Sequence, residues 1–142
     1  MVYVIPARTW PLRKYLKSMA KILLIEDDKA TRILYRDILE DEGHSVTEAE
    51  DGAKGMAYIR TNPVDVIITD LIMPVKDGIE VINETTQSDT AIPIIAISGG
   101  GLGAPDPYLS AAKALGANVA LKKPISRNEF LSAVDECLTI EG

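Results

Sequence analysis

The sequence predicts an α/β fold in which five parallel strands form one sheet and alternate with helices. Short apolar runs recur along the 142 residues, and apolar residues at helical spacing occupy the stretches between them. Three of the runs are almost purely aliphatic, which is typical of parallel strands buried on both faces. Connections between parallel strands are right-handed, so the helices should cover both faces of an open sheet. The expected strands are Ile22–Ile25, Val46 with its neighbours, Val64–Thr69, Ile94–Ser98 and Asn118–Lys122.

The first three helices are indicated by apolar spacing and by the residues that begin them. Lys29–Glu42 should place apolar side chains on one face, namely Ala30, Ile33, Leu34, Ile38 and Leu39. Asp51 is expected to cap the second helix, and Asp77 with Gly78 opens the third. His44 follows Gly43 at the turn after the first helix, where a surface position is expected.

The last two helices have clearer ends. Asp106 followed by Pro107 is typical of a cap and a first-turn proline, and Gly116 should end this helix. Its expected inward face carries Tyr108, Ala111, Ala112 and Leu115. Residues Ser126–Glu129 form a capping box for the final helix. The inward face of that helix should carry Phe130, Ala133, Val134, Cys137 and Leu138.

Composition excludes several classes of protein. The net charge is −6, but residues 1–18 carry four basic and no acidic side chains (+4), which leaves 11 basic and 21 acidic residues (−10) for the remainder. We therefore expect a basic N-terminal extension over 1–18 and one domain over 19–142. An acidic domain with 5% aromatic residues is a poor nucleic-acid binder, and no apolar run is long enough to span a membrane. The single Cys137 excludes an intrachain disulfide and a zinc cluster and favours a reducing, cytoplasmic location.

Chemically active residues follow four of the expected strands. Glu26-Asp27-Asp28, Asp70, Ser98 and Lys122-Lys123 each stand at a strand's carboxyl end. In an open α/β sheet these ends meet at one edge, which is where ligands bind. Crowded carboxylates repel one another unless a cation neutralises them, and oxygen ligands favour Mg²⁺. A carboxylate beside Mg²⁺ and an ammonium group is placed to attack a phosphoryl group.

In these residues the chain resembles the receiver domain of bacterial response regulators, which sensor histidine kinases phosphorylate. The carrying motifs are Ile22–Asp28, the segment Asp70–Gly78, which fits D-x-x-M-P-x-x-D-G, Ser98, and the pair Lys123-Pro124. The resemblance covers roughly residues 20–140. It implies a flavodoxin-like (βα)5 three-layer sandwich with strand order 2-1-3-4-5.

The resemblance also implies a role for each matched position. Asp70 would be the phosphoacceptor. Mg²⁺ would be held by Asp27 directly, by Glu26 through water, by Asp70 and by the backbone carbonyl of Ile72. Ser98 and Lys123 would bind the phosphoryl group. The Lys123–Pro124 peptide bond is usually cis in the family, and Asp28 would be a less essential acid.

We therefore expect a stand-alone receiver, because the chain reaches residue 142 soon after the final helix. It would take a phosphoryl group from a histidine kinase or phosphotransfer protein and control binding of a downstream protein or act in a phosphorelay. It would assist its own phosphorylation and dephosphorylation but turn over no separate substrate. The alternatives are a constitutive pseudo-receiver and a Mg²⁺-dependent aspartyl phosphatase. Ile72 stands where such phosphatases usually carry a second acid, which counts against that alternative. A third alternative, a flavodoxin-like FMN protein, is disfavoured because the acidic loop after the first strand would repel the phosphate of FMN.

Two departures from the family concern how a signal is read. Ala120 stands three residues before Lys123, where the family often has Tyr or Phe, so an aromatic switch is not expected. The loop that follows Ser98 is rich in glycine, and we expect Gly99, Gly100 and Gly101 to form a switch loop. A homodimer would then form through the helix from Pro107, the strand before Lys123 and the final helix.

Overall fold

The five strands form one parallel sheet, and numbered along the chain they lie in the order 2-1-3-4-5 that the resemblance to receiver domains implies. The computed structural model describes residues 20–73, 75–88, 91–99 and 106–139, so the extension 1–18 lies outside the described residues. The elements, in chain order, are β1 (Lys21–Ile25), α2 (Lys29–Asp41), β2 (Ser45–Ala49), α3 (Gly52–Ile59), β3 (Val66–Asp70), α4 (Gly78–Gln87), β4 (Ile94–Ser98), α5 (Pro107–Leu115), β5 (Val119–Lys122) and α6 (Arg127–Leu138).

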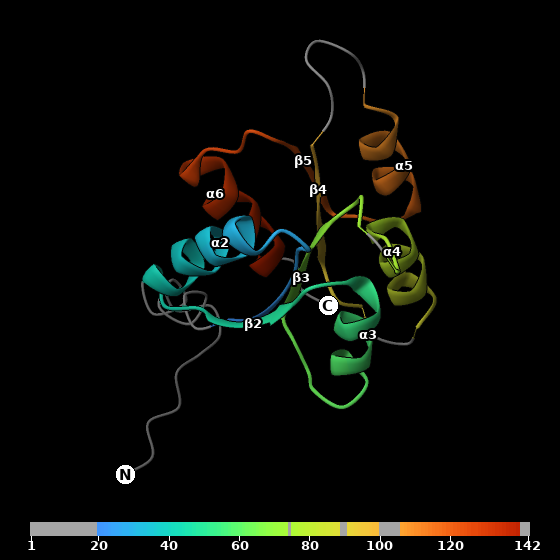
Figure 1. Cartoon of the computed structure of the whole chain (residues 1–142), viewed down its shortest axis with the longest axis horizontal. Helices are drawn as coiled ribbons and strands as arrows, with labels where there is room; N and C mark the ends of the chain where they lie inside the picture. The colour runs from blue at the N-terminus through green and yellow to red at the C-terminus, as the bar shows by residue number, and fades with distance from the viewer. Residues whose placement is uncertain (1–19, 74, 89–90, 100–105, 140–142) are drawn as a thin grey trace.

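The sheet separates two layers of helices, α2 with α6 on one face and α3, α4 and α5 on the other (Figure 1). Side chains alternate along β1, so that Ile22 and Leu24 enter one core while Leu23 and Ile25 enter the other. All four are 1% exposed or less. Burial on both faces explains why the strand sequences are continuously aliphatic.

Side chains that cap the helices explain where each helix begins. Asp28, Asp51, Asp77, Asp106 and Ser126 each accept a hydrogen bond from a backbone N–H in the first turn of the helix that follows. Pro107 occupies the first helical turn of α5, and Gly116 ends this helix with φ 123°. The predicted helix starts are therefore confirmed.

The predicted inward faces of α2 and α5 are partly wrong. Leu39 is fully buried as predicted, but Leu34 is 56% exposed, and Tyr35, which the spacing does not predict to be buried, is buried instead. The ring of Tyr35 lies 4.8 Å from that of Phe130 on α6, and this contact sets the rotation of α2. On α5, Tyr108 and Leu115 are exposed, while Ala112 is fully buried.

The expected surface position of His44 is also wrong, because only 6% of the residue is exposed. Gly43 has φ 93°, a left-handed conformation that glycine adopts without steric cost. The turn continues with the backbone N–H of His44 donating to the carbonyl of Leu39 at 3.2 Å. Burial lowers the pKa of His44, and Nδ1 of its ring has no hydrogen-bond partner among the described residues.

Two glycines bring α3 and α4 close to the segment that follows β3. A side chain at Gly78 would collide with the backbone carbonyl of Asp70, and one at Gly52 with the carbonyl of Lys76. The backbone N–H of Gly78 donates to the carbonyl of Leu71 at 3.0 Å, and that of Gly52 donates to the carbonyl of Lys76 at 3.1 Å. The segment between β3 and α4 is therefore held at two points.

None of the helices in the described part of the chain combines the length and apolarity needed to cross a bilayer.

Candidate functional site

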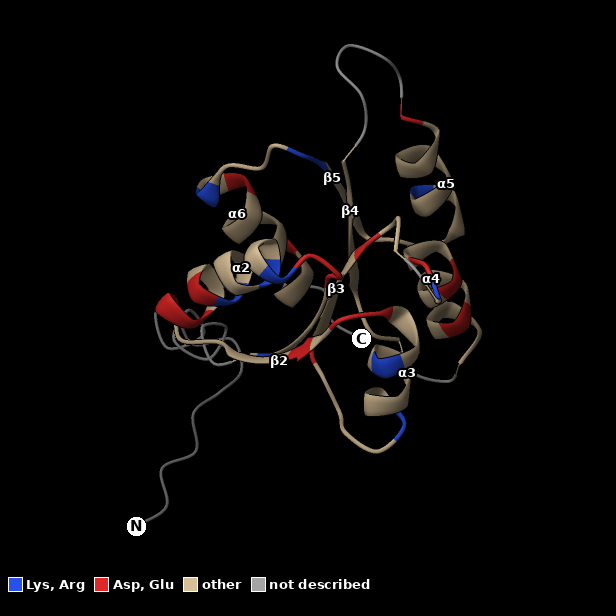
Figure 2. Ribbon diagram, viewed as in Figure 1, with Lys and Arg blue, Asp and Glu red and all other residues tan. Residues whose placement is uncertain are grey.

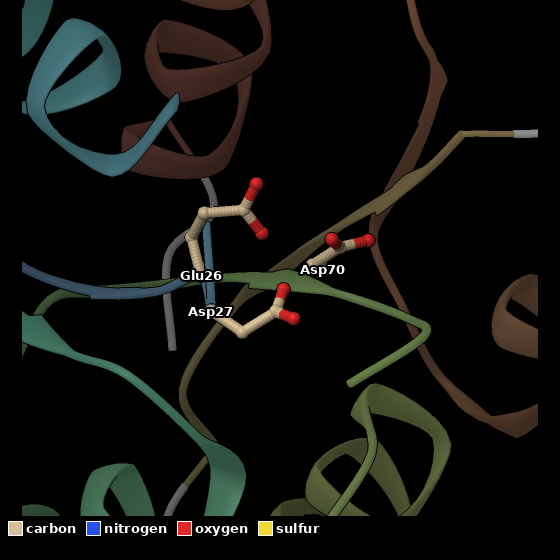
Figure 3. Close-up of side chains that lie close together, drawn as sticks. All are labelled: Glu26, Asp27 and Asp70. Atoms are coloured by element: carbon tan, nitrogen blue, oxygen red, sulfur yellow. The ribbon is translucent and has the colours of Figure 1, made fainter. Parts of the chain in front are cut away.

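Three carboxylates gather at the carboxyl ends of β1 and β3 (Figure 3). Glu26 and Asp27 follow β1, and Asp70 ends β3, which pairs with β1 in parallel register. One oxygen from each of the three side chains lies within 4.8 Å of the others. Glu26 is buried, Asp70 is partly buried and Asp27 is exposed, so this cluster opens to solvent on the side of Asp27.

Lys123 contacts two of these carboxylates from the end of β5. Its Nζ lies 3.2 Å from Oε1 of Glu26 and 3.5 Å from Oδ2 of Asp70. The backbone N–H of Lys123 donates to the carbonyl of Ser98 at 2.8 Å, which fixes where its side chain starts. Figure 2 shows basic residues (blue) at the end of β5 and acidic residues (red) in the loop that leads from the sheet into α2. Of the two adjacent lysines, Lys123 is thus the one that reaches the acids, and the Lys123–Pro124 peptide bond is cis.

The titration of the cluster follows from its burial. Desolvation, together with the hydrogen bond and the charge of Asp70, raises the pKa of Glu26 to about 8, although Lys123 opposes the shift. Burial disfavours the charged form of Lys123, but the carboxylates of Asp70 and Glu26 outweigh it, and the pKa of Lys123 is raised. At neutral pH Glu26 therefore tends to hold a proton that partly relieves the repulsion between the acids.

The donor set fits a hard divalent cation. All the clustered donors are carboxylate oxygens, which are the ligands that Mg²⁺ prefers, and no histidine or cysteine belongs to the group. Oε2 of Glu26 is buried without a hydrogen-bond partner among the described residues. A buried, unpartnered carboxylate oxygen is costly, and a cation would both pair with it and replace the proton that Glu26 holds.

Ser98 is fully buried at the end of β4. Its hydroxyl donates a hydrogen bond of 2.5 Å to Oδ2 of Asp106. This hydrogen bond is the largest cause that holds the pKa of Asp106 below its usual range. Sequence reasoning assigns Asp106 only as a helix cap, because nothing in the local pattern indicates that it also faces Ser98.

Two other predicted site residues, Ile72 and Gly99, come soon after the ends of β3 and β4. Ile72 is 58% exposed on the segment after β3. Gly99 is exposed, and a side chain built there would meet nothing within 4 Å. Gly100 and Gly101, the rest of the predicted switch loop, lie outside the described residues. Sequence reasoning missed the contribution of Arg32. Its Nη1 donates a hydrogen bond to the backbone carbonyl of Glu26 at 2.8 Å, and no local pattern indicates this contact.

Comparisons with known proteins agree with this fold and site. The family model of the response regulator receiver domain matches residues 22–135. Chemotaxis protein CheY of Halobacterium salinarum is 33% identical over 122 residues, which cover 85% of this chain and 99% of CheY. The transcriptional regulatory protein GlrR of Escherichia coli is 33% identical over 119 residues, but the match covers only 26% of GlrR.

Among solved structures, the chemotaxis response regulator CheY4 of Vibrio cholerae superimposes with a TM-score of 0.76 at 30% identity. The match covers 84% of this chain and 99% of CheY4. Family model, full-length relatives, strand order and the cluster at the sheet edge all agree. This chain therefore belongs to the response regulator receiver domains of two-component systems.

Proposed function

We propose that the chain is a phosphoacceptor receiver and that Asp70 accepts the phosphoryl group of a phosphorylated histidine on a sensor kinase or phosphotransfer protein. The observation that carries this proposal is the convergence of Glu26, Asp27 and Lys123 on Asp70 at one sheet edge. Full-length similarity to CheY supports a chain that acts as a receiver on its own. The same function implies a cytoplasmic location.

The chemistry at Asp70 is a direct transfer. A carboxylate oxygen of Asp70 forms a bond to phosphorus, the phosphorus–nitrogen bond of the donor histidine breaks, and its electron pair leaves with the imidazole, which takes up a proton. Glu26, Asp27, Asp70 and the carbonyl of Ile72 would hold Mg²⁺. When bound, Mg²⁺ supplies positive charge that neutralises the phosphoryl oxygens.

Lys123 and Ser98 complete the proposed site. The ammonium of Lys123, already 3.5 Å from Asp70, would pair with a phosphoryl oxygen. The hydroxyl of Ser98 would donate to another phosphoryl oxygen once it leaves Asp106. Neither residue turns over a separate substrate, so the chain assists only its own phosphorylation and dephosphorylation.

The signal would then be read by a downstream protein, a phosphorelay partner or a second copy of the chain. The surface proposed for this is formed by α5, β5 and α6. Tyr108 is 48% exposed and Leu115 39% exposed on α5, and they offer apolar contacts to a partner. This surface adjoins Ser98 through Asp106, which links it to the phosphorylation site.

The test is incorporation of acid-labile phosphate from acetyl phosphate with and without Mg²⁺. We expect incorporation to require Mg²⁺ and to be lost in Asp70→Asn. The matched control is Asp28→Asn, which changes a neighbouring acid outside the cluster and keeps a residue type that caps α2. Phosphate on Asp70→Asn, or equal loss in Asp28→Asn, would show that Asp70 is not the acceptor.

A further inference from the structure

Two arginines one turn apart on α2 contact Glu48 of β2, but only one of them reaches the acidic cluster. Arg32 places Nε 3.2 Å from Oε1 of Glu48 and donates from Nη1 to the carbonyl of Glu26 at 2.8 Å. Arg36 places Nη1 3.1 Å from Oε2 of Glu48, and its other partners are Asp37 and Glu40 of its own helix. The side chain of Arg32 is 15% exposed and that of Arg36 is 32% exposed.

The carbonyl that Arg32 contacts belongs to the peptide unit between Glu26 and Asp27. A peptide unit is planar, so fixing the direction of its carbonyl fixes the plane from which both neighbouring residues extend. The backbone N–H of Glu26 is anchored as well, since it donates to the carbonyl of Ala49 at 3.0 Å. Asp28 is fixed as the cap of α2. Asp27 thus lies exposed between two held residues, and Arg32 controls the peptide that joins it to Glu26.

Arginine is suited to this position in a way that lysine is not. Its guanidinium is planar, with donors in a fixed fork, so it holds the Glu26 carbonyl and the Glu48 carboxylate at a set angle. Glu48 also compensates the charge of Arg32, so the cation near the cluster does not act as an uncompensated positive charge. A lysine at this position would keep a charge and a donor but would lose the fixed angle.

We infer that Arg32 is a positioning residue for the acidic cluster and sets the orientation of the Glu26 and Asp27 carboxylates toward a common cation. This inference rests on the proposed function, because it assumes that the cluster binds Mg²⁺. It predicts that Arg32 affects how tightly Mg²⁺ binds, while the groups that would carry out phosphoryl transfer at Asp70 stay in place. Removal of residues that orient metal ligands typically weakens binding about 10- to 100-fold.

The experiment compares Arg32→Gln with Arg36→Gln by calorimetric titration with Mg²⁺ alone. Both variants lose an ion pair to the same Glu48, so a general effect of surface charge changes them equally. We expect Arg32→Gln to bind Mg²⁺ about tenfold more weakly and Arg36→Gln to stay within about twofold of the parent protein. The amide resonance of Asp27 should also shift without Mg²⁺ in Arg32→Gln and stay in place in Arg36→Gln.

A second readout separates positioning from chemistry. At saturating Mg²⁺ the phosphorylation rate of Arg32→Gln should return to within about twofold of the parent rate, since Asp70 and Lys123 are unchanged. Arg32→Lys, which also serves if Arg32→Gln does not fold, should bind Mg²⁺ with an intermediate affinity. Parent-like Mg²⁺ affinity in Arg32→Gln or Arg32→Lys, or an equal loss in Arg36→Gln, would overturn the role of Arg32. Absence of Mg²⁺ binding in the parent protein would instead overturn the proposed function and the inference with it.

Discussion

The carboxylate of Asp106 joins Ser98 to the first turn of α5. Its Oδ2 accepts a 2.5 Å hydrogen bond from the Ser98 hydroxyl, and its Oδ1 accepts from the backbone N–H of Tyr108 at 2.9 Å. The Ser98 hydroxyl has one proton, so it cannot donate to Asp106 and to a phosphoryl group on Asp70 at the same time. Phosphorylation would therefore remove one of the hydrogen bonds that hold Asp106, at the point where α5 begins.

We expect a phosphoryl mimic to change the protection of α5 against hydrogen exchange. Beryllofluoride with Mg²⁺ should alter the exchange of backbone amides in the first turn of α5, because Asp106 loses its bond from Ser98. The amides of α3, which Asp51 caps independently, serve as the internal control. Mass-spectrometric hydrogen exchange measures both segments together. Changes confined to α3, with α5 unaltered, would contradict this route for the signal.

Asp106→Asn should bind the phosphoryl mimic more tightly than the parent protein. Asparagine still caps a helix, but it offers Ser98 a neutral acceptor, and bonds to neutral groups are about half as strong as bonds to ionised ones. A loss of about 1 kcal/mol in the competing bond corresponds to an increase of about fivefold in affinity for beryllofluoride. Asp51→Asn, which alters a cap without a bond to Ser98, is the control and should bind as the parent does. An unchanged affinity in Asp106→Asn would mean that Asp106 does not compete for Ser98.

Ile72→Asn should shorten the lifetime of the phosphorylated state. Ile72 is exposed two residues after Asp70, and its side chain cannot hydrogen-bond a water molecule, whereas an amide there could orient one for attack. We expect hydrolysis to become about tenfold faster, because proper positioning is worth at least this much. Val75→Asn is the matched control, since Val75 is an exposed apolar residue on the same segment but farther along the chain. The decay of labelled phosphate gives the rates, and an equal or longer lifetime in Ile72→Asn would refute the argument.

The contribution of His44 to stability should fall as the pH drops below about 6.5, whereas Glu26, whose folded-state pKa is raised, changes stability in the opposite direction. Burial lowers the pKa of His44 in the folded state, while the unfolded chain takes up a proton there at the ordinary value of about 6.5. Below that pH His44 binds more protons in the unfolded state than in the folded state, so its contribution to the free energy of unfolding decreases as the pH falls, until the folded pKa is reached. Asp135 and Glu42 are the charged groups that oppose the shift.

Urea unfolding at pH 7.5 and 5.5 measures this effect in the parent protein and in His44→Gln. Relative to the parent protein, the variant should be favoured at pH 5.5 over pH 7.5. Subtracting the change in one protein from the change in the other removes the effect of the carboxylates that both carry, Glu26 included. His44 is the only histidine in the chain, so its ring resonance reports the folded pKa directly. A folded pKa at or above 6.5 would contradict the prediction.

A chain that begins at Met19 should fold and accept phosphate as the full chain does. The described core begins at Ala20, which is 4% exposed and accepts a hydrogen bond from the backbone N–H of Ser45 at 2.9 Å. All the caps and site residues lie after this point. Circular dichroism and phosphate incorporation test both properties. Loss of either in the shortened chain would show that residues 1–18 contribute to the domain.

Sequence alone predicts the parts of this protein that depend on local chemistry and on the rules for parallel sheets. Strands such as Ile94–Ser98 are recognisable because both their faces are buried, and caps such as Asp106 are recognisable because each serves the helix that immediately follows. The acidic cluster is predictable because strand ends meet at one edge of the sheet.

The errors arise where a distant contact decides the outcome. The rotation of α2 depends on the packing of Tyr35 against Phe130, and no spacing within α2 contains that information. The second partner of Asp106 and the bond from Arg32 to the Glu26 carbonyl are likewise tertiary contacts. His44 is buried by a turn whose direction depends on the left-handed conformation of Gly43.

The close approach of Gly78 to the backbone of Asp70 makes the surroundings of this carboxylate unequal in stiffness. On the side of α4 there is no room for even one extra carbon atom, so the backbone of Asp70 cannot yield in that direction. On the side of β4 and α5, the Ser98 hydroxyl donates to Asp106, and it could donate to a phosphoryl oxygen instead by rotation of one bond. A phosphoryl group on Asp70 would therefore shift the structure toward β4 and α5, where a hydrogen bond can rearrange, and not toward α4, where the backbones are already in contact.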